Sequence, residues 1–276
     1  MSKLIFSAFS RLKRDKVFWT ALVCVLAFSA VSILNSCRHY DPEIISELNN
    51  LDHHYFNIIP MLAIVFAVFT SLFLGTEYSD GVIRNKIISG HTRANIYISN
   101  LIATFAASVC LLIASLTGGL AGIPTFGWLK MGSGQLALYL AICVLLTASL
   151  SAIFTFIGML ISNKAASAVI SILLAIGLIL IASVIYNALC EPEMTGGAII
   201  TMEGIQMQEP HPNPRYIGGL LRKIYQFVID FLPTGQGIQM TNLEIGHPVQ
   251  MIVYSLLITF GMSAGGISVF RKKNLK

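Results

Sequence analysis

The residues with the most obvious capacity to ligate a metal are Asp52, His53 and His54, in a polar and acidic segment at 37–56. Metal sites usually take three or four ligands at defined spacing, and adjacent histidines point apart in most backbones. We therefore expect a solvated loop at 37–56 and no metal site.

The sequence also lacks the motifs of two large enzyme classes. It has no GxxxxGK[ST] phosphate-binding loop and no HExxH zinc motif. These motifs supply the groups that cradle phosphates or activate a zinc-bound water. We therefore expect that the chain is not an enzyme, does not hydrolyse ATP itself and binds no cofactor of its own.

Long apolar blocks dominate the chain, whose 276 residues are 55% hydrophobic and 11% charged. A helix needs about 20 apolar residues to cross the hydrocarbon core of a bilayer. Six blocks without Asp, Glu, Lys, Arg or His meet this requirement: 17–36, 57–75, 96–117, 136–158, 165–189 and 249–269. The sequence predicts an all-α integral membrane protein with a single transmembrane domain over 1–276. Because ionisable groups inside spans usually mark proton relays or ion paths, their absence indicates that the energy for any transport comes from a partner protein.

The basic residues divide unevenly between the two sides of the membrane. Of the 18 Lys and Arg residues, five precede the first span, three lie between spans two and three, one lies between spans four and five, and four follow span six. This places 13 on the side of both termini and 5 on the other side. Since basic flanks stay in the cytoplasm, we predict a multi-pass cell-membrane protein with cytoplasmic N and C termini. The net charge of +5 then reflects topology and contact with membrane lipids, and we expect no nucleic-acid partner.

The segment 76–95, TEYSDGVIRNKIISGHTRAN, is predicted to hold a short amphipathic helix on the cytoplasmic side. Ser79 is a fair N-cap, Gly90 can take the left-handed conformation that ends a helix, and Thr92 can cap the third span. The apolar edge consists of Val82, Ile83, Ile87 and Ile88, and the polar side of Arg84, Asn85 and Lys86. The alternative is an ordinary loop with helical propensity.

Two further segments have an amphipathic pattern. The first 16 residues indicate either a short interfacial helix or a plain basic flank. In the long outer segment, 190–248, the part up to Pro214 is expected to be irregular. The apolar spacing over 216–232 predicts an extracellular amphipathic or re-entrant helix, and Pro233 is expected to end this helix. Cys37 and Cys190 both fall at outer helix ends, where they could form a disulfide or stay free.

The whole arrangement resembles the membrane (permease) subunit of type 2 ABC (ATP-binding cassette) exporters. The resemblance rests on six spans with both ends inside, a short amphipathic helix between spans two and three, and outer interfacial helices before span six. The local match to the family's coupling-helix region is the series Glu77, Gly81, Arg84, Ser89 and Arg93. The ending from Phe270 to Leu275 also resembles the family's aromatic and basic ending. The chain departs from the family in lacking Pro near Gly90 and Lys near Asn100.

The resemblance implies a translocation path made by two permease subunits, identical or different. Two separate cytoplasmic ATPase subunits would bind ATP and magnesium. The helix within 76–95 would dock on the ATPase and pass its closure to spans one, two and five. The residues expected to couple the chain to the ATPase are Glu77, Gly81, Arg84, Lys86, His91 and Arg93.

The cargo and the function class are less narrowly predicted. The spans are apolar with scattered Ser, Thr and Phe, which suits a hydrophobic or amphipathic cargo such as a peptide antibiotic, a bacteriocin or a lipid. Antibiotic resistance or immunity is one role of that kind. An alternative is a non-transporting membrane sensor or scaffold that recruits a cytoplasmic partner through the same helix. A membrane enzyme would need a polar catalytic cluster at membrane depth, where the sequence offers only Ser, Thr and Asn.

Overall fold

The computed structural model describes residues 1–39, 50–201 and 204–273. Within these ranges, six helices are long and apolar enough to cross a membrane. They are α2 (Lys16–Arg38), α4 (Leu62–Ser79), α6 (Arg93–Gly119), α8 (Ser133–Leu160), α9 (Lys164–Cys190) and α12 (Pro248–Lys272). The predicted all-α integral membrane fold with six transmembrane helices is confirmed.

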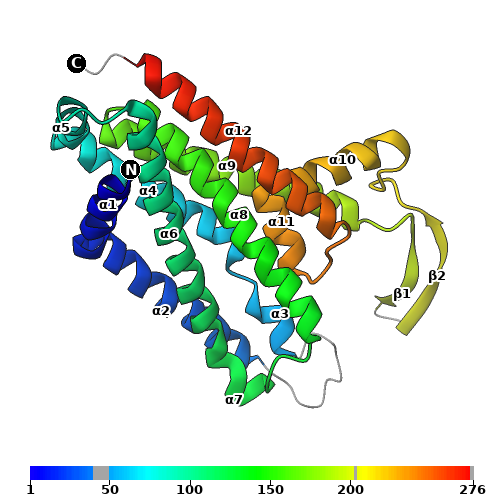
Figure 1. Cartoon of the computed structure of the whole chain (residues 1–276). Coiled ribbons are helices and arrows are strands. Elements are labelled where there is room, and N and C mark those ends of the chain that lie inside the picture. Colours follow the sequence, from blue (N-terminus) through cyan, green and yellow to red (C-terminus); the bar gives the residue numbers. More distant parts are fainter. Residues whose placement is uncertain (40–49, 202–203, 274–276) are drawn as a thin grey trace.

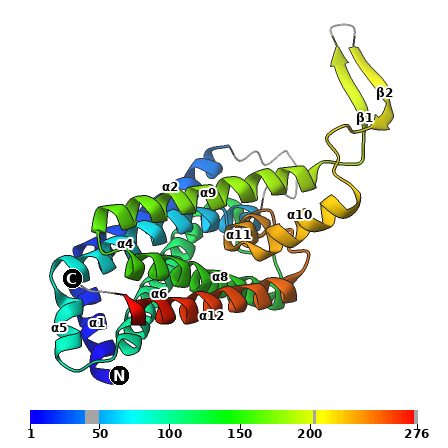
Figure 2. The ribbon, with the colours of Figure 1, turned by 90° about the horizontal axis from the view of Figure 1, so that it is seen from above.

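Met1 and the C-terminal end of α12 lie at the same end of the helix bundle, together with α1 (Ser2–Arg14) and α5 (Val82–Ile88), as Figure 1 shows. We call this the terminal end. Helix α12 packs on α8, α2 on α6, and α4 on α9, and α8 and α12 lie side by side in Figure 2. Of the six spans α4 is the most buried and α12 the least, so the core is centred on α4, α6 and α8.

The N-terminal segment forms the amphipathic helix that was one of two predicted possibilities. Leu4, Ala8 and Leu12 are buried at a spacing of four residues, which is one face of a helix. That face packs against α6. Asp15 then ends α1 and caps α2, because its Oδ1 accepts the N–H of Val17 at 2.7 Å.

The opposite end is more ordered than the sequence indicated. Residues expected to form a solvated loop instead form α3 (Leu51–Tyr55), followed by the 3₁₀ turn η2 (Ile59–Met61). Asp52 is only 7% exposed, and its carboxylate accepts the Lys130 N–H at 3.1 and 3.2 Å. The expectation was wrong for 51–55 because buried Leu51 and a distant backbone donor hold this turn in place. Residues 40–49 of the expected loop lie outside the described residues.

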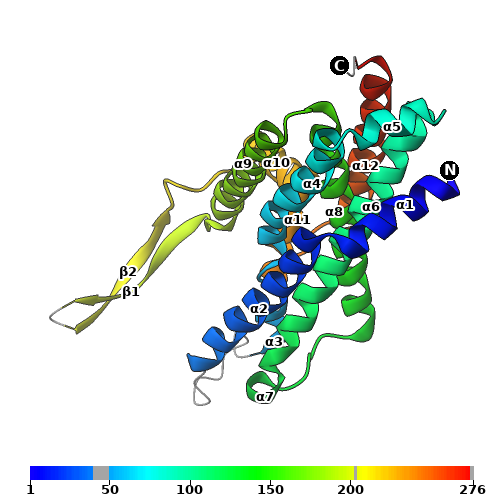
Figure 3. The ribbon, with the colours of Figure 1, turned by 90° about the vertical axis from the view of Figure 1, so that its left-hand side faces the viewer.

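The segment after α9 is a β-hairpin, not the expected irregular stretch. Strand β1 (Met194–Thr201) pairs antiparallel with β2 (Gly204–Pro212), and the hairpin projects from the end of α9 away from the bundle (Figures 2 and 3). Gly and Pro disfavour regular strands. The register of the hairpin shifts between Thr195 and Gly197, and this irregularity accommodates Gly196 and Pro210. The two strands are so close here that a Cβ on Gly196 would lie 2.7 Å from the Cα of Pro210.

The predicted amphipathic outer helix is present as α10 (Gly219–Phe231). A further helix, α11 (Pro233–Thr241), was not predicted. Pro233 ends α10 as expected, but it also begins α11, because proline has a favourable φ for the first helical turn. Thr234 anchors α11 by donating to the Leu178 carbonyl of α9 at 2.9 Å. The third span continues through η3 (Leu120–Gly122) into α7 (Ile123–Phe126). Cys37 and Cys190 are free thiols.

Candidate functional site

Helix α5 is set apart from its neighbours by two left-handed glycines. Gly81 has φ +67° and Gly90 has φ +82°, conformations that cost other residues free energy. Thr92 caps α6 by accepting the Asn95 N–H at 3.3 Å. The predicted short helix, the left-handed Gly90 and the Thr92 cap are confirmed, and the cytoplasmic position of the helix stays a prediction. The predicted N-cap at Ser79 is wrong, because α4 continues through Ser79 and breaks only at Gly81.

The buried carboxylate of Glu77 holds α5 against the bundle. Glu77 is 1% exposed, and its Oε1 lies 2.5 Å from Lys86 Nζ of α5 and 2.8 Å from Arg11 Nη1 of α1. Its Oε2 accepts the Asn100 side-chain N–H of α6 at 2.6 Å. One carboxylate at the end of α4 therefore joins three other helices.

The cations around Glu77 are strongly desolvated. Burial lowers the pKa of Lys86 to about 8, and the nearby charge of Arg11 adds to this effect. Burial also lowers the pKa of Arg11 to about 10. The Arg11 guanidinium lies over the Phe73 ring at 3.7 Å, and its nitrogens have no well-aligned hydrogen bond within the described chain. The contact with Glu77 and the nearby charges of Asp15 and Asp80 therefore compensate for its burial.

A second group of contacts fixes the C-terminal end of α12 at the terminal end of the bundle. Arg93 donates to the carbonyl of Arg271 at 3.0 Å and to the carbonyl of Lys273. These carbonyls are at the C-terminus of α12, where a positive charge is favourable. Lys273 Nζ in turn donates to Tyr78 Oη at 2.9 Å and to the Met159 carbonyl at 3.1 Å. Burial lowers the pKa of Lys273 to about 8. The last turn of α12 is thus tied to α4, α6 and α8.

The outward surface of α5 has a different character. Arg84, Asn85 and Ile88 are exposed, and Ile88 is 74% exposed although it is a large apolar residue. His91 is half-buried just beyond the helix. We call Arg84, Asn85 and Ile88 the α5 tip. It combines one positive charge, one amide and one apolar side chain on a short helix whose inner face is anchored.

The sequence over residues 4–184 matches the family described as ABC-2 family transporter protein. This chain belongs to the ABC-2 family of transporter membrane proteins. The match reaches from α1 into α9. It includes the α5 tip and the group Arg11, Glu77, Lys86 and Asn100, which we call the Glu77 cluster. No curated protein matches the chain in sequence. Membership identifies the chain as the permease component of an ABC transporter, a component that lacks an ATPase of its own and associates with an ATP-binding subunit.

The structure divides the predicted coupling residues of this permease into groups. Glu77 and Lys86 come together in the interior, Arg84 faces outward, and Arg93 binds the end of α12. Their role in coupling remains a prediction. Sequence reasoning did not include Arg11, Asn100 or Ile88 among the coupling residues. A signal for Asn100 was available, since the family often has Lys near this position and a buried carboxylate needs a donor there.

A serine motif in the last span has no catalytic geometry in this permease. Gly261 to Gly265 have the spacing Gly-x-Ser-x-Gly, which in hydrolases places serine on a sharp turn between a strand and a helix. Here the motif lies inside α12, and Ser263 donates to the Thr259 carbonyl at 2.6 Å. A side chain bonded to its own helix backbone is not positioned as a nucleophile.

Proposed function

We propose that this permease is part of an ATP-driven exporter and that its terminal end lies in the cytoplasm. There the α5 tip docks on a separate ATPase subunit, which binds ATP and magnesium. The observation that carries the proposal is the contrast within α5: its inner face is anchored to Glu77, and its outer face presents Arg84, Asn85 and Ile88. The excess of Lys and Arg near both termini supports the orientation.

The residues of the segment 77–93 have different parts in this docking. Ile88 supplies an apolar anchor, because a few side chains that insert into a partner's pocket carry most of the binding energy of an interface. Arg84 and His91 set the register of docking, as charges at an interface rim do. Gly81 gives α5 its angle to α4.

In this proposal, the Glu77 cluster transmits a displacement of α5 to the membrane-spanning helices. Because Lys86 is paired with Glu77, a displacement of α5 moves the end of α4. From α4 the displacement reaches α9, since Ser71 Oγ donates to Ser171 Oγ at 3.0 Å in the buried contact between these helices. The pair Arg11–Glu77 connects the same point to α1, which leads directly into α2. Spans one, two and five therefore respond together.

A second permease subunit, identical or different, completes the translocation path. Helices α2 and α9 support this part of the proposal because most of their length is unburied within one chain, and a partner subunit as well as membrane lipids would cover them. The cargo is a hydrophobic or amphipathic molecule, such as a peptide antibiotic, a bacteriocin or a lipid. Protection of the cell against such a molecule, by resistance or immunity, is the physiological role that fits this cargo.

Co-purification with the ATPase subunit tests the docking. We expect the double variant Arg84→Glu with Ile88→Ser to lose at least about 2 kcal/mol of binding, or roughly 30-fold in affinity, as for interface anchors in general. The matched control is Arg14→Glu, which reverses an exposed charge on α1 at the same end of the bundle. Unchanged co-purification and unchanged ATP-dependent export in the double variant would refute the assignment.

The same complex separates a transporter from a sensor. A transporter reconstituted with its ATPase hydrolyses ATP faster when cargo is added and accumulates the cargo on one side of the vesicle. A scaffold recruits the partner through α5 without moving cargo. Recruitment with no cargo movement in vesicles would replace the exporter proposal by the sensor alternative.

A further inference from the structure

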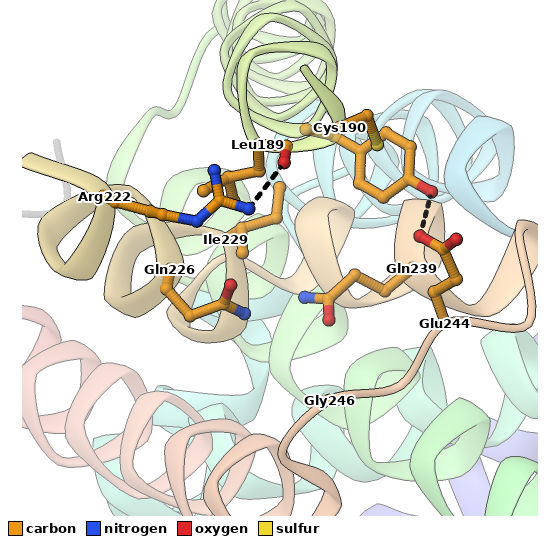
Figure 4. A pocket seen from close by; sticks show the side chains of 9 residues that line it. Leu189, Cys190, Arg222, Gln226, Ile229, Gln239, Glu244 and Gly246 are labelled. Atoms are coloured by element: carbon orange, nitrogen blue, oxygen red, sulfur yellow. Dashed lines mark hydrogen bonds between the residues drawn. The ribbon is translucent and has the colours of Figure 1, made fainter. Parts of the chain in front are cut away.

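A polar cavity of about 350 Å³ lies at the end of the bundle opposite the termini. It is enclosed by the last turn of α9, one face of α10, the helix α11 and the connection to α12, as Figure 4 shows. Its polar lining consists of Tyr186, Cys190, Arg222, Gln226, Gln239 and Glu244. None of these residues belongs to the α5 region, so the cavity is a separate feature of the molecule.

Helix α10 separates this cavity from an apolar exterior. Arg222, Gln226 and Ile229 line the cavity, and their spacing of four and three residues places them on one helix face. The other face exposes Leu220, Leu221, Ile224 and Phe227. A helix with this pattern at the end of a transmembrane bundle lies in the membrane interface with its apolar face toward hydrocarbon. The cavity therefore lies at the depth of lipid headgroups.

Arg222 places a positive charge in the cavity wall. Its guanidinium donates to the Leu189 carbonyl at 2.9 Å and the Ile217 carbonyl at 3.4 Å, which use two of its five N–H groups. No carboxylate within the described ranges forms an ion pair with it. A guanidinium with free N–H groups and no counter-ion is a binding group for phosphate or carboxylate.

The other side of the cavity offers acceptors. Glu244 accepts the Tyr186 hydroxyl through Oε2 at 2.7 Å, which leaves Oε1 available. Gln226 and Gln239 direct their NH₂ groups to the buried Asp230, with Gln239 Nε2 at 2.9 Å from Oδ1. Because Asp230 takes these donors, the amide oxygens of both glutamines are free to accept. Figure 4 shows the two glutamine side chains pointing toward one another across the cavity.

We propose that this cavity binds the zwitterionic headgroup of a phosphoethanolamine lipid from the adjacent leaflet. The phosphate pairs with Arg222, and the primary ammonium donates to Glu244 and the glutamine oxygens. A choline headgroup carries the same charges but has no N–H to donate, so the site discriminates against it. The apolar face of α10 is in contact with the hydrocarbon, which makes a membrane lipid, rather than a soluble zwitterion, the source of this headgroup.

Lipid retention measures the proposed selectivity on the purified full chain. The chain is equilibrated in vesicles of phosphatidylethanolamine, phosphatidylcholine and phosphatidylglycerol, extracted in detergent, and its retained lipids are quantified by mass spectrometry. We expect about tenfold enrichment of the ethanolamine lipid over the choline lipid, the effect of one charge-assisted hydrogen bond. Glu244→Gln should remove the discrimination, and Arg222→Gln should remove retention of both lipids. Lys223→Gln, an exposed neighbour outside the cavity, should retain the wild-type pattern.

Modification of Cys190 gives a second readout at the site itself. Cys190 is an exposed free thiol that lines the cavity, and its rate of alkylation is followed on the intact protein by peptide mass spectrometry. We expect ethanolamine lipid to slow alkylation in the wild type and in Lys223→Gln but not in Arg222→Gln. Equal retention of both lipids by the wild type, or protection by soluble phosphoethanolamine but not by the lipid, would overturn the proposal. No ATPase is present in these experiments, so their outcome is independent of the docking of α5.

Discussion

Replacement of Glu77 by Gln tests whether one carboxylate holds α1, α5 and α6 to the end of α4. Glutamine has the same size as glutamate but carries no charge. In the wild type, Glu77 is 1% exposed and lies 2.5 Å from Lys86 Nζ and 2.8 Å from Arg11 Nη1. The substitution leaves these two cations close together in a desolvated site with no anion between them.

The expected cost is large for a single substitution. Removing one partner of a buried ion pair destabilises a protein by about 3–5 kcal/mol. At about 2–4 °C per kcal/mol for a chain of this length, the midpoint of thermal unfolding should fall by roughly 6–20 °C. Adding Lys86→Met to Glu77→Gln removes one of the two unpaired cations, so the double variant should be more stable than Glu77→Gln alone.

The measurement is the fraction of the detergent-solubilised chain that stays monodisperse after heating. The matched control is Glu193→Gln, which makes the same chemical change at an exposed position outside the cluster. We expect this control to lie within about 0.5 kcal/mol of the wild type, as exposed substitutions usually do. If Glu77→Gln unfolded at the same temperature as the control, or if Lys86→Met made Glu77→Gln worse, the reasoning about the cluster would be wrong.

Two further predictions concern the same region. Gly81→Ala should lower the free energy of unfolding by about 1–2 kcal/mol, because alanine is strained at φ +67° although no atom would lie within 4 Å of its Cβ. The control Gly134→Ala lies at a helical position equally free of contacts and should be neutral or slightly stabilising. Equal midpoints of thermal unfolding for the two variants would refute the prediction. The folded-state pKa of Lys86 is about 8 and the ordinary value is 10.5, so the folded chain loses this proton first and the unfolded chain binds more protons between these pH values. The stability of the wild type relative to Lys86→Met should therefore rise from pH 8 to 10.5, and a flat or falling difference in unfolding midpoints over that window would contradict the assignment.

The six spans were predictable because insertion into a bilayer depends on local composition. A block of about 20 apolar residues spans the hydrocarbon whatever it packs against. The elements at the opposite end depend on contacts distant in sequence. Helix α11 lies between η2, α8, α9 and α10, and the β-hairpin needs a register shift to accommodate Gly196 and Pro210. Neither feature has a periodic pattern that the sequence would reveal.

The coupling region was only partly predictable, for a similar reason. The glycines and the cap at Thr92 act on their own backbone, so residue type alone indicates where α5 ends. The partners of a charged side chain depend on which helices meet. The sequence pattern assigned Lys86 to the polar side of the predicted helix. In the structure, the chain turns at Gly81 and the Lys86 side chain points back to Glu77. Arg11 comes from a helix that is distant in sequence.

By itself, the sequence of this permease determined that it crosses the membrane six times and that a short helix follows the second crossing. These properties arise from hydrophobicity and backbone preference, which are local. Tertiary structure alone decided that Glu77 is a buried anchor, that Ile88 and Arg84 form the free surface of α5, and that the polar face of α10 encloses a cavity. Burial and charge pairing are properties of packed neighbours, and those neighbours come from helices far apart in the chain.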